Sequence, residues 1–456
     1  MIHTPITRLA EFLATLSPES VPGEVAAQAD LCLLDTLGCM IAGAETQEAQ
    51  QLLRAETATN PGDICSVAGG GRHSLLGAAR INAYQGDIFE LNDLIAGHAS
   101  IGNVAAALAL GEARGVSGSA LRIALVAGIE TSGRIYNAFY PYQKSLDEVG
   151  TVSVGLVSSV GAAAACARLL NLTMEQTAHA LAIAAGWANW CPAEVIFGDG
   201  GAAKPMLFGG LPATSGISAA LAAAEGMTGP LHILDSDKGY FATMAHRWDA
   251  SAFETSDWAL AAPRRKLHAC CGYIHSAYDS AEELVTRSGL KPDEITSVIV
   301  EVPPYIIPAI RKAAPPTTPN EARFHMQYML AQALTGAGPV TPRMSNDFTA
   351  EFARPEIRRL TDRITVIGAE DLTQYHQSRL TIRRTAGQDL TAANNAPRGT
   401  AQNPLDRQAL TAKFIDLSTP ALGESSTHRI LDYLTDLALA TSVSDLGGMI
   451  QAKGAY

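Results

Sequence analysis

The 456-residue sequence has few charged side chains and no excess of basic ones. Charged residues make up 17% of the chain, and the formal net charge is -12. Nucleic-acid-binding proteins normally present a basic face, so nucleic acid is not expected as a partner. Hydrophobic residues make up 47%, which is typical of a well-buried globular enzyme and excludes extensive disorder.

The thiols lack the pattern of a crosslinked or zinc-binding protein. Their number is odd, their spacing is irregular, and no CxxC pair occurs. Neither a disulfide framework nor a zinc site is therefore predicted, and free thiols are typical of the reducing cytoplasm. The cysteines are Cys32, Cys39, Cys65, Cys166, Cys191, Cys270 and Cys271.

Targeting and membrane-spanning segments are not expected either. Residues Met1 to Ser17 contain the acidic Glu11 and no long apolar core, which argues against a signal peptide. Alanine-rich stretches such as Val160 to Ala167 are too short and too interrupted to cross a bilayer. We therefore expect a cytoplasmic protein without a membrane partner.

Common cofactor and nucleophile motifs are missing as well. The glycine-rich run Ala68 to Gly71 has neither the GxGxxG spacing nor the βαβ surroundings of a dinucleotide site. The run Gly198 to Lys204 lacks GK[ST], and neither GxSxG nor HExxH occurs. The sequence predicts an enzyme that needs no cofactor and no metal ion.

What the sequence does contain is helical periodicity from Thr7 to about Ala262, followed by β-branched alternation beyond Pro263. We predict a mainly α protein with a large all-helical domain (1–263), a smaller α+β domain (264–404) and a C-terminal return to the helical domain (405–456). A site at the domain interface is the default expectation. Expected helices are 24–42, 75–89, 103–112, 121–135, 155–170, 174–190 (with a capping box from Thr173 to Gln176), 215–225, 322–335, 355–361, 405–414 and 426–445; expected strands are 295–302, 364–367 and 378–383, with an irregular loop over 385–405.

The most informative segment runs from Pro263 to His275 and contains three consecutive cations, two histidines and two adjacent thiols. It leads into an amphipathic helix that begins near Ser276. Cationic and imidazole groups at a helix entrance favour a bound anion, which points to an acidic small molecule. The alternative is a surface turn before a helix.

Two other segments carry groups suited to acid–base work or anion binding. Asp93 could orient or activate His98 at a helix-to-loop junction; alternatively, it caps a helix and His98 is a loop residue. Lys204 has only Asp199 as a charge partner nearby in sequence. It could bind a carboxylate or act as a base, unless it is a solvated loop lysine.

A third candidate lies between Asn320 and Tyr328. On one continuous helix, Arg323 and Gln327 would share a face, with Tyr328 close to it. Arginine binds carboxylates in a bidentate manner, and tyrosine can donate a hydrogen bond or a proton. The alternative is an ordinary amphipathic helix.

Taken together, these segments resemble the MmgE/PrpD family over nearly the whole chain. The resemblance implies a large helical domain plus a smaller α+β domain, a homodimer, and an interface site that binds small polycarboxylates. It also implies that Asp93, His98, Lys204, Lys266, His275 and Tyr328 line that site. The matching positions are 33–38, 128–130, 162–164, 169–172, Lys204-Pro205, Gly216, Gly229-Pro230, Lys266, Cys271, His275, Glu321-Ala322-Arg323 and Tyr328.

The chain also departs from the family pattern. The usual first segment resembles H-x-x-D-F-D-D-T, followed by His-Pro. Here Asp87 takes the position of the opening histidine, and Ala99 that of the proline. The aspartates become Glu90, Asn92 and Asp93, and the threonine becomes Leu94. A further family histidine is absent near Thr151 or Val152.

Losing that histidine and part of the acidic motif favours epimerisation, which needs a base and an acid on opposite faces of a carbon but no leaving group. The sequence therefore predicts an epimerase of an amino- or imino-dicarboxylate such as iminodisuccinate. Lys266 and His98 would exchange protons, Lys204, Arg323 and His275 would hold carboxylates, and Tyr328 and Asp93 would orient groups. Alternatives are a lyase (a methylcitrate-type dehydratase or a cis-aconitate-type decarboxylase) and a non-catalytic binding protein.

Overall fold

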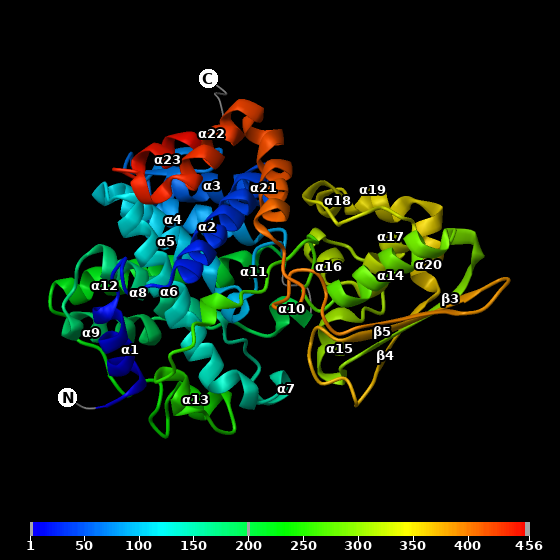
Figure 1. Ribbon diagram of the computed structural model, residues 1–456, viewed down its shortest axis with the longest axis horizontal. Helices are drawn as coiled ribbons and strands as arrows, with labels where there is room; N and C mark the ends of the chain where they lie inside the picture. The colour runs from blue at the N-terminus through cyan, green and yellow to red at the C-terminus, as the bar shows by residue number, and fades with distance from the viewer. Residues whose placement is uncertain (1–2, 198–200, 452–456) are drawn as a thin grey trace.

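Helices rich in alanine and glycine form the larger of two lobes (Figure 1). The computed structural model describes residues 3–197 and 201–451. At the centre lies α8 (Val154–Leu169), which is buried on nearly every side and contacts α5, α6, α9 and α12. This lobe contains α1 (Pro5–Thr15), α2 (Gly23–Ala44), α3 (Gln47–Thr59), α4 (Leu75–Asp87), α5 (Ala99–Arg114), α6 (Gly118–Phe139), α9 (Met174–Gly186), α11 (Ala203–Pro205), α12 (Leu211–Ala224), α21 (Arg407–Leu422), α22 (Glu424–Thr435) and α23 (Ser444–Met449).

Small side chains set how closely these helices approach. A Cβ atom at Gly161 would lie 2.6 Å from the carbonyl oxygen of Gly128, and one at Gly216 would lie 2.4 Å from the Cβ of Ala162. Both distances are far below van der Waals contact. The backbones of α6, α8 and α12 can therefore meet only because glycine stands at these crossings.

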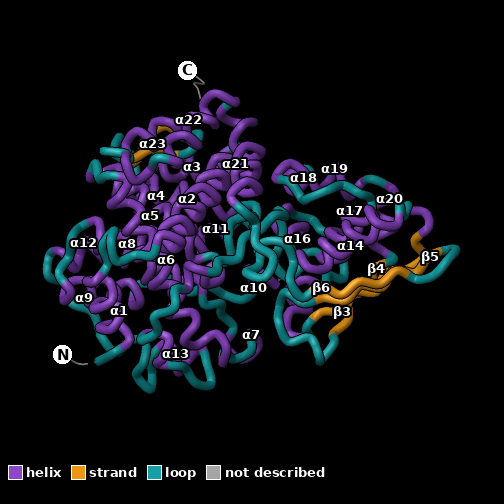
Figure 2. Tube along the Cα trace, in the orientation of Figure 1, coloured by secondary structure: helices purple, strands orange, loops and turns teal. Residues whose placement is uncertain are grey.

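The smaller lobe is built on a sheet with the strand order β4-β3-β5-β6 (Figure 2). β3 (Ile295–Val302) runs parallel to β4 (Ile364–Gly368) and antiparallel to β5 (Ser378–Arg384), which pairs with β6 (Leu390–Asn394). Alternate residues of β3 are buried, as expected for a sheet covered on one face. The cover consists of α14 (His275–Ser288) against β5 and β6, and α17 (Met326–Leu334) against β4.

This architecture confirms the predicted mainly α fold with a smaller α+β part, and the capping box from Thr173 to Gln176 is present. Two element predictions were wrong. Residues 385–405 are not all loop, because pairing with β5 makes a strand of β6, a segment without apolar alternation of its own. The helix expected over 322–335 is divided, since the Nδ1 atom of His325 accepts a hydrogen bond from the Tyr328 N–H and so caps a new helix.

Three further details differ from the sequence prediction. The helix expected over 174–190 ends at Gly186, and the one expected over 426–445 is interrupted between α22 and α23. A short hairpin of β1 (Cys65–Val67) and β2 (Gly71–His73) was not expected. Each case involves a short or polar segment, in which local periodicity carries little information.

Among residues 3–197 and 201–451, two helical stretches are long and apolar enough to cross a membrane by length and composition alone, Gly23–Ala44 and Ala203–Ala224. Their apolar windows are 72% and 61% buried inside the protein. Core helices of a folded domain pass the same test, so the expectation of no membrane partner stays a prediction.

A buried lysine on α21 contacts α2 and the segments that lead from the larger lobe to the smaller one. Lys413 Nζ donates to Asp35 Oδ1 at 2.6 Å, to the Leu91 carbonyl at 2.7 Å and to the Lys266 carbonyl at 2.8 Å. The Lys413 side chain is 6% exposed and that of Asp35 is fully buried. One ammonium group thus satisfies acceptors from three separate chain segments.

Replacing Lys413 by methionine should lower the free energy of unfolding by about 3–5 kcal/mol, because Asp35 would keep a buried and uncompensated charge. Urea unfolding followed by circular dichroism measures this change. Lys238→Met, at an exposed position, is the matched control and should alter stability by less than about 0.5 kcal/mol. Equal stability of the two variants would contradict the role given to Lys413.

Candidate functional site

Two acidic residues stand at the end of α4, where the chain turns towards the smaller lobe. Asp87 is the last helical residue, and Glu90 follows with a φ of 54°. His98, immediately before α5, has a φ of 97°. Side-chain-bearing residues rarely adopt such angles. Strained backbone of this kind is typical of sites where side-chain placement matters more than local stability.

Glu90 binds two lysines from distant parts of the chain. Its Oε2 atom lies 2.7 Å from Lys266 Nζ, which also donates to the Glu90 carbonyl at 2.5 Å. Its Oε1 atom pairs with Lys204, whose Nζ lies 2.6 Å from Asp87 Oδ2. All four side chains are at most 3% exposed. Two carboxylates and two ammonium groups thus balance one another in a water-poor environment.

This pairing fixes the charge states of its members. Burial alone would raise the pKa of Glu90, but the ammonium groups of Lys204 and Lys266 hold that pKa well below its usual range. Burial alone would lower the pKa of Lys204, but Asp87 and Glu90 raise it above its usual value. Glu90 is therefore a carboxylate and Lys204 an ammonium group at neutral pH.

His98 completes the cluster with an oriented imidazole. Its Nδ1 atom lies 3.0 Å from Asn92 Oδ1 and 3.3 Å from Asp87 Oδ1, and its Nε2 atom lies 3.5 Å from Glu90 Oε2. Asn92 donates its amide to the Asp93 carbonyl, which leaves its oxygen facing His98. Because Nδ1 faces two acceptors, it carries the proton of the neutral ring. Burial lowers the pKa of His98, so the imidazole is neutral at pH 7.

Beside this cluster lies a cavity of about 1060 Å³ between the lobes. Glu90 and His98 line it, whereas Lys204 and Lys266 stand directly behind Glu90. Cys271 also lines it as a neutral thiol, since burial raises its pKa to about 12. Much of the remaining wall is aromatic and comes from both lobes: Tyr136, Tyr140, Phe208, Tyr273, Tyr305, Phe324 and Tyr375.

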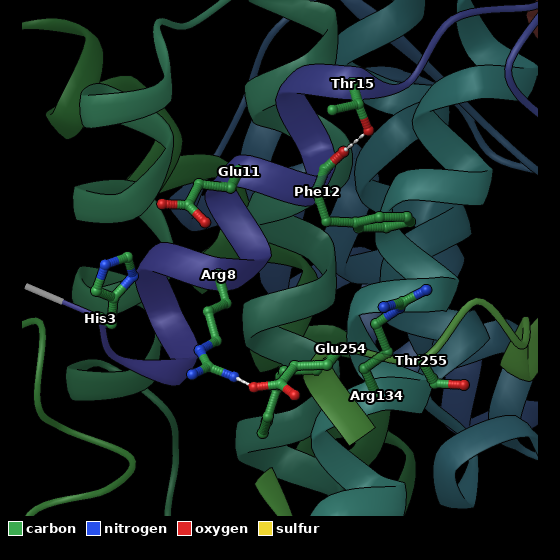
Figure 3. Close-up of a pocket in the computed structure, with 9 residues that line it drawn as sticks. His3, Arg8, Glu11, Phe12, Thr15, Arg134, Glu254 and Thr255 are labelled. Carbon is green, nitrogen blue, oxygen red and sulfur yellow. Dashed lines mark hydrogen bonds and ion pairs between the residues drawn. The ribbon is translucent and has the colours of Figure 1, made fainter. Parts of the chain in front are cut away.

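A second cavity, of about 460 Å³, lies beside α1 on the larger lobe (Figure 3). Figure 3 shows the ion pair of Arg8 with Glu254 at its edge. Arg134 pairs with Glu130 at 3.0 Å and places its guanidinium 4.1 Å from the ring centroid of Phe12. Because its arginines are committed to structural contacts, this cavity is a weaker candidate than the one between the lobes.

Three of the residues predicted from the sequence meet in one place: His98, Lys204 and Lys266 all adjoin Glu90. Asp93 points elsewhere. Its Oδ1 atom accepts hydrogen bonds from Ser100 Oγ at 2.5 Å and from the Ile95 N–H at 3.3 Å. Asp199, expected as a partner of Lys204, lies outside the described residues.

Tyr328, His275 and Arg323 lie in the interior of the smaller lobe, and none of them lines the cavity. Tyr328 packs with its ring centroid 5.7 Å from that of Phe352. His275 Nε2 lies 3.3 Å from the Cys270 carbonyl oxygen, and Arg323 Nε donates to Ser345 Oγ at 2.6 Å. The catalytic and binding roles assigned to them stay predictions.

The helical face expected to carry both Arg323 and Gln327 does not form, since α16 (Pro319–Arg323) ends before α17 begins. The joint anion site expected from the cationic run does not form either. Arg264 donates to the Gly272 carbonyl, Arg265 donates to Gln28, and only Lys266 reaches Glu90. Neighbouring residues of an extended segment point in different directions, which separates the three cations.

Asp93 is not the partner of His98 that the sequence predicts, because Asp87, Glu90 and Asn92 surround the imidazole instead. Asp87 and Glu90, three residues apart at a helix end, were the available signal. The tyrosines of the cavity wall carried no such signal, because they are scattered over the sequence.

Asp87, Glu90 and His98 place oxygen and nitrogen atoms within 4.8 Å of one another, a spacing that could hold a metal ion. Both carboxylates are, however, engaged by lysine ammonium groups. A divalent cation would have to displace these charges or endure their repulsion. The cluster is therefore better suited to proton chemistry than to metal binding.

Comparison with known proteins bears on these residues. The MmgE/PrpD N-terminal domain matches residues 7–252, and the MmgE/PrpD C-terminal domain matches residues 268–439. A cis-aconitate decarboxylase of Aspergillus terreus is 24% identical over 96% of this chain and 94% of its own. The human cis-aconitate decarboxylase is 25% identical over 70% of this chain and 66% of its own. The cis-aconitate decarboxylase-like protein oryM of Aspergillus oryzae is 28% identical over 60% of each chain.

These relatives overturn the epimerase prediction, because the enzymes they name are decarboxylases and therefore lyases. The prediction rested on a missing histidine near Thr151 or Val152 and on a reduced acidic motif. Both absences are real, but the site still contains two carboxylates, because Asp87 and Glu90 lie beside His98. The missing family side chains were therefore a poor basis for predicting epimerisation.

Replacing Glu90 by glutamine should destabilise the protein by about 3–5 kcal/mol at pH 7, since two buried ammonium groups lose a shared partner. The pKa of Glu90 is depressed in the folded state, so its contribution is present above the unfolded pKa and disappears as pH falls through the folded value. The difference in unfolding free energy between wild type and Glu90→Gln should therefore narrow below about pH 4.5.

Urea unfolding at pH 7 and at acidic pH measures this narrowing. Glu283→Gln is the control, because that carboxylate belongs to an i,i+4 pair with both side chains 63% exposed. It should change stability by less than about 0.5 kcal/mol. A constant gap between wild type and Glu90→Gln across the whole pH range would contradict the ion-pair argument.

Proposed function

The chain belongs to the MmgE/PrpD family, and from that premise we propose that it is a lyase of small polycarboxylates that releases carbon dioxide from a cis-aconitate-like acid. The observation that carries the proposal is the pairing of His98 with a carboxylate, Glu90, whose charge two buried lysines offset on one wall of the cavity between the lobes. The names of the relatives supply the reaction class.

Decarboxylation of an unsaturated tricarboxylic acid moves an electron pair from one carbon to another, and negative charge develops along the way. The bond from a saturated carbon to its carboxylate breaks, and its electron pair forms a new C=C bond. The electron pair of the original double bond then takes a proton at the far carbon. The products are carbon dioxide and an unsaturated dicarboxylic acid, and one proton is consumed. The protein must therefore hold carboxylates, stabilise charge and deliver one proton.

His98 is suited to deliver that proton. In the free protein its imidazole is neutral, because burial lowers its pKa. A polycarboxylate in the cavity would bring further negative charge beside the ring and raise the pKa, so that binding and proton uptake are coupled. The resulting imidazolium would be both a charge partner for substrate and the acid that protonates the new C–H position.

Lys204 and Lys266 have a different role in this proposal. They neutralise Glu90 and Asp87, so that the floor of the cavity does not repel an anion. Neither amine lines the cavity, so direct proton transfer from Lys266 would require Glu90 to move. We therefore assign the lysines to electrostatic positioning and His98 to the proton transfer.

Purified protein incubated with cis-aconitate in deuterated water should release carbon dioxide in a one-to-one ratio with deuterium incorporation at a single carbon of the product. Proton NMR and a carbon dioxide trap measure both quantities. His98→Gln should lower kcat by about 10²–10⁴-fold, the usual contribution of a positioned acid, while Lys238→Met should leave it unchanged. Loss of water from a citrate-like acid without carbon dioxide release would instead assign the chain to the dehydratases.

The value of kcat/KM should decline by about tenfold per pH unit above the pKa of His98 in the free protein, because the neutral ring must first take up a proton. That pKa is lowered from 6.5, so the decline should begin on the acid side of 6.5. The value of kcat should stay constant up to a higher pH than kcat/KM, because bound substrate raises the pKa of His98. A pH profile that His98→Gln leaves unchanged would contradict the assignment.

A further inference from the structure

The cavity between the lobes is larger than a small polycarboxylate needs. Its volume is about 1060 Å³, whereas cavities of about 300–1,000 Å³ already enclose drug-sized ligands. The charged cluster occupies one part of its wall, where Glu90 and His98 face inward. A small acid held there would leave most of the cavity empty.

The remaining wall carries a group of tyrosines contributed by both lobes, which we call the tyrosine wall: Tyr136, Tyr140, Tyr273, Tyr305 and Tyr375. Tyr136 and Tyr140 stack with ring centroids 4.2 Å apart and an interplanar angle of 21°. Within the smaller lobe, the centroids of Tyr273 and Tyr375 are 5.7 Å apart. The guanidinium carbon of Arg264 lies 4.6 Å from the Tyr375 centroid and fixes that ring.

The phenol groups lie close enough to affect one another. Burial raises the pKa of Tyr136, and Tyr140 and Tyr375 raise it further. Burial also raises the pKa of Tyr140 to about 12. Tyr136 and Tyr140 are therefore neutral at pH 7 and add no positive charge for a carboxylate, although each hydroxyl can donate a hydrogen bond.

The two charged residues at the rim, Lys144 and Asp147, carry opposite signs. Lys144 donates to the carbonyl oxygens of Ala242 at 2.8 Å and Thr243 at 3.1 Å. Asp147 also lines the cavity and would repel a carboxylate. An apolar group, by contrast, would gain by leaving water for a surface of stacked rings.

We infer that the substrate carries, besides the carboxylates held beside His98, an extended apolar substituent, alkyl or aryl, that lies along the tyrosine wall. This inference rests on the proposed function and deepens it by naming the substrate class. In the bound state the acid head lies at the charged end and the apolar tail contacts rings from both lobes. The tail thereby adds affinity without touching the groups that take part in bond breaking.

The test is calorimetric binding of methyl-, butyl- and octyl-substituted succinates to the full chain. Each methylene that becomes buried should tighten binding by up to about fourfold, so the octyl acid should bind far more tightly than the methyl acid. Tyr140→Ala and Tyr375→Ala should reduce that octyl-to-methyl ratio by about tenfold or more. Tyr140→Phe and Tyr375→Phe keep the rings and should keep the ratio, which distinguishes ring contact from hydrogen bonding by the hydroxyl.

Affinity that does not rise with chain length, or that falls, would overturn the inference, as would alanine variants that keep the full ratio. The outcome is separate from that of the proposed function because binding is measured without turnover. Protein that favours the long-chain acids but releases no carbon dioxide from any unsaturated acid would refute the lyase and support the tyrosine wall. Protein that decarboxylates cis-aconitate without a chain-length effect would refute the tyrosine wall alone.

Discussion

The contact on which the site depends is the double ion pair of Glu90 with Lys204 and Lys266. The three residues come from the turn after α4, from α11 and from the segment that leads into the smaller lobe. Each charge is buried, so none is stable without the others. Lys413 supports the same segments through the carbonyls of Leu91 and Lys266. The cluster therefore ties α4 and α11 of the larger lobe to the segment that leads into the smaller one.

The cluster also indicates how an acidic protein could bind the anionic substrate that we propose. The formal net charge of -12 belongs to the whole molecule, whereas a substrate in the cavity would interact mainly with nearby groups, because salt screens distant charges. Beside the cavity, two ammonium groups offset the charges of two carboxylates, and the neutral imidazole of His98 adds no charge. The balance leaves His98 free to gain a proton when an anion arrives. In the proposed reaction the protonated His98 both attracts the substrate anion and acts as the acid that protonates it.

Long elements could be predicted from the sequence, because a helix such as α8 or a strand such as β3 repeats its own pattern many times. His98, Lys204 and Lys266 could be identified by residue type next to predicted element ends. The partner of His98 could not, since a φ of 54° at Glu90 redirects the chain and turns Asp93 towards Ser100. The tyrosine wall could not be predicted for another reason: apart from Tyr136 and Tyr140, its members come from separate segments, and only the packing of two lobes brings Tyr136 near Tyr375.

Charged groups and aromatic rings line different parts of the cavity, and this arrangement favours one orientation of the proposed substrate. A substrate with an acid head and an apolar tail could enter in two ways. In the reversed pose its carboxylates would face neutral phenols, which can donate hydrogen bonds but supply no positive charge, and would lose the imidazolium of His98 as a partner. Leaving charges unpaired costs more than misplaced apolar contact. In the proposed reaction the reversed pose is thus disfavoured, and the preferred pose would place the reacting carbon beside His98.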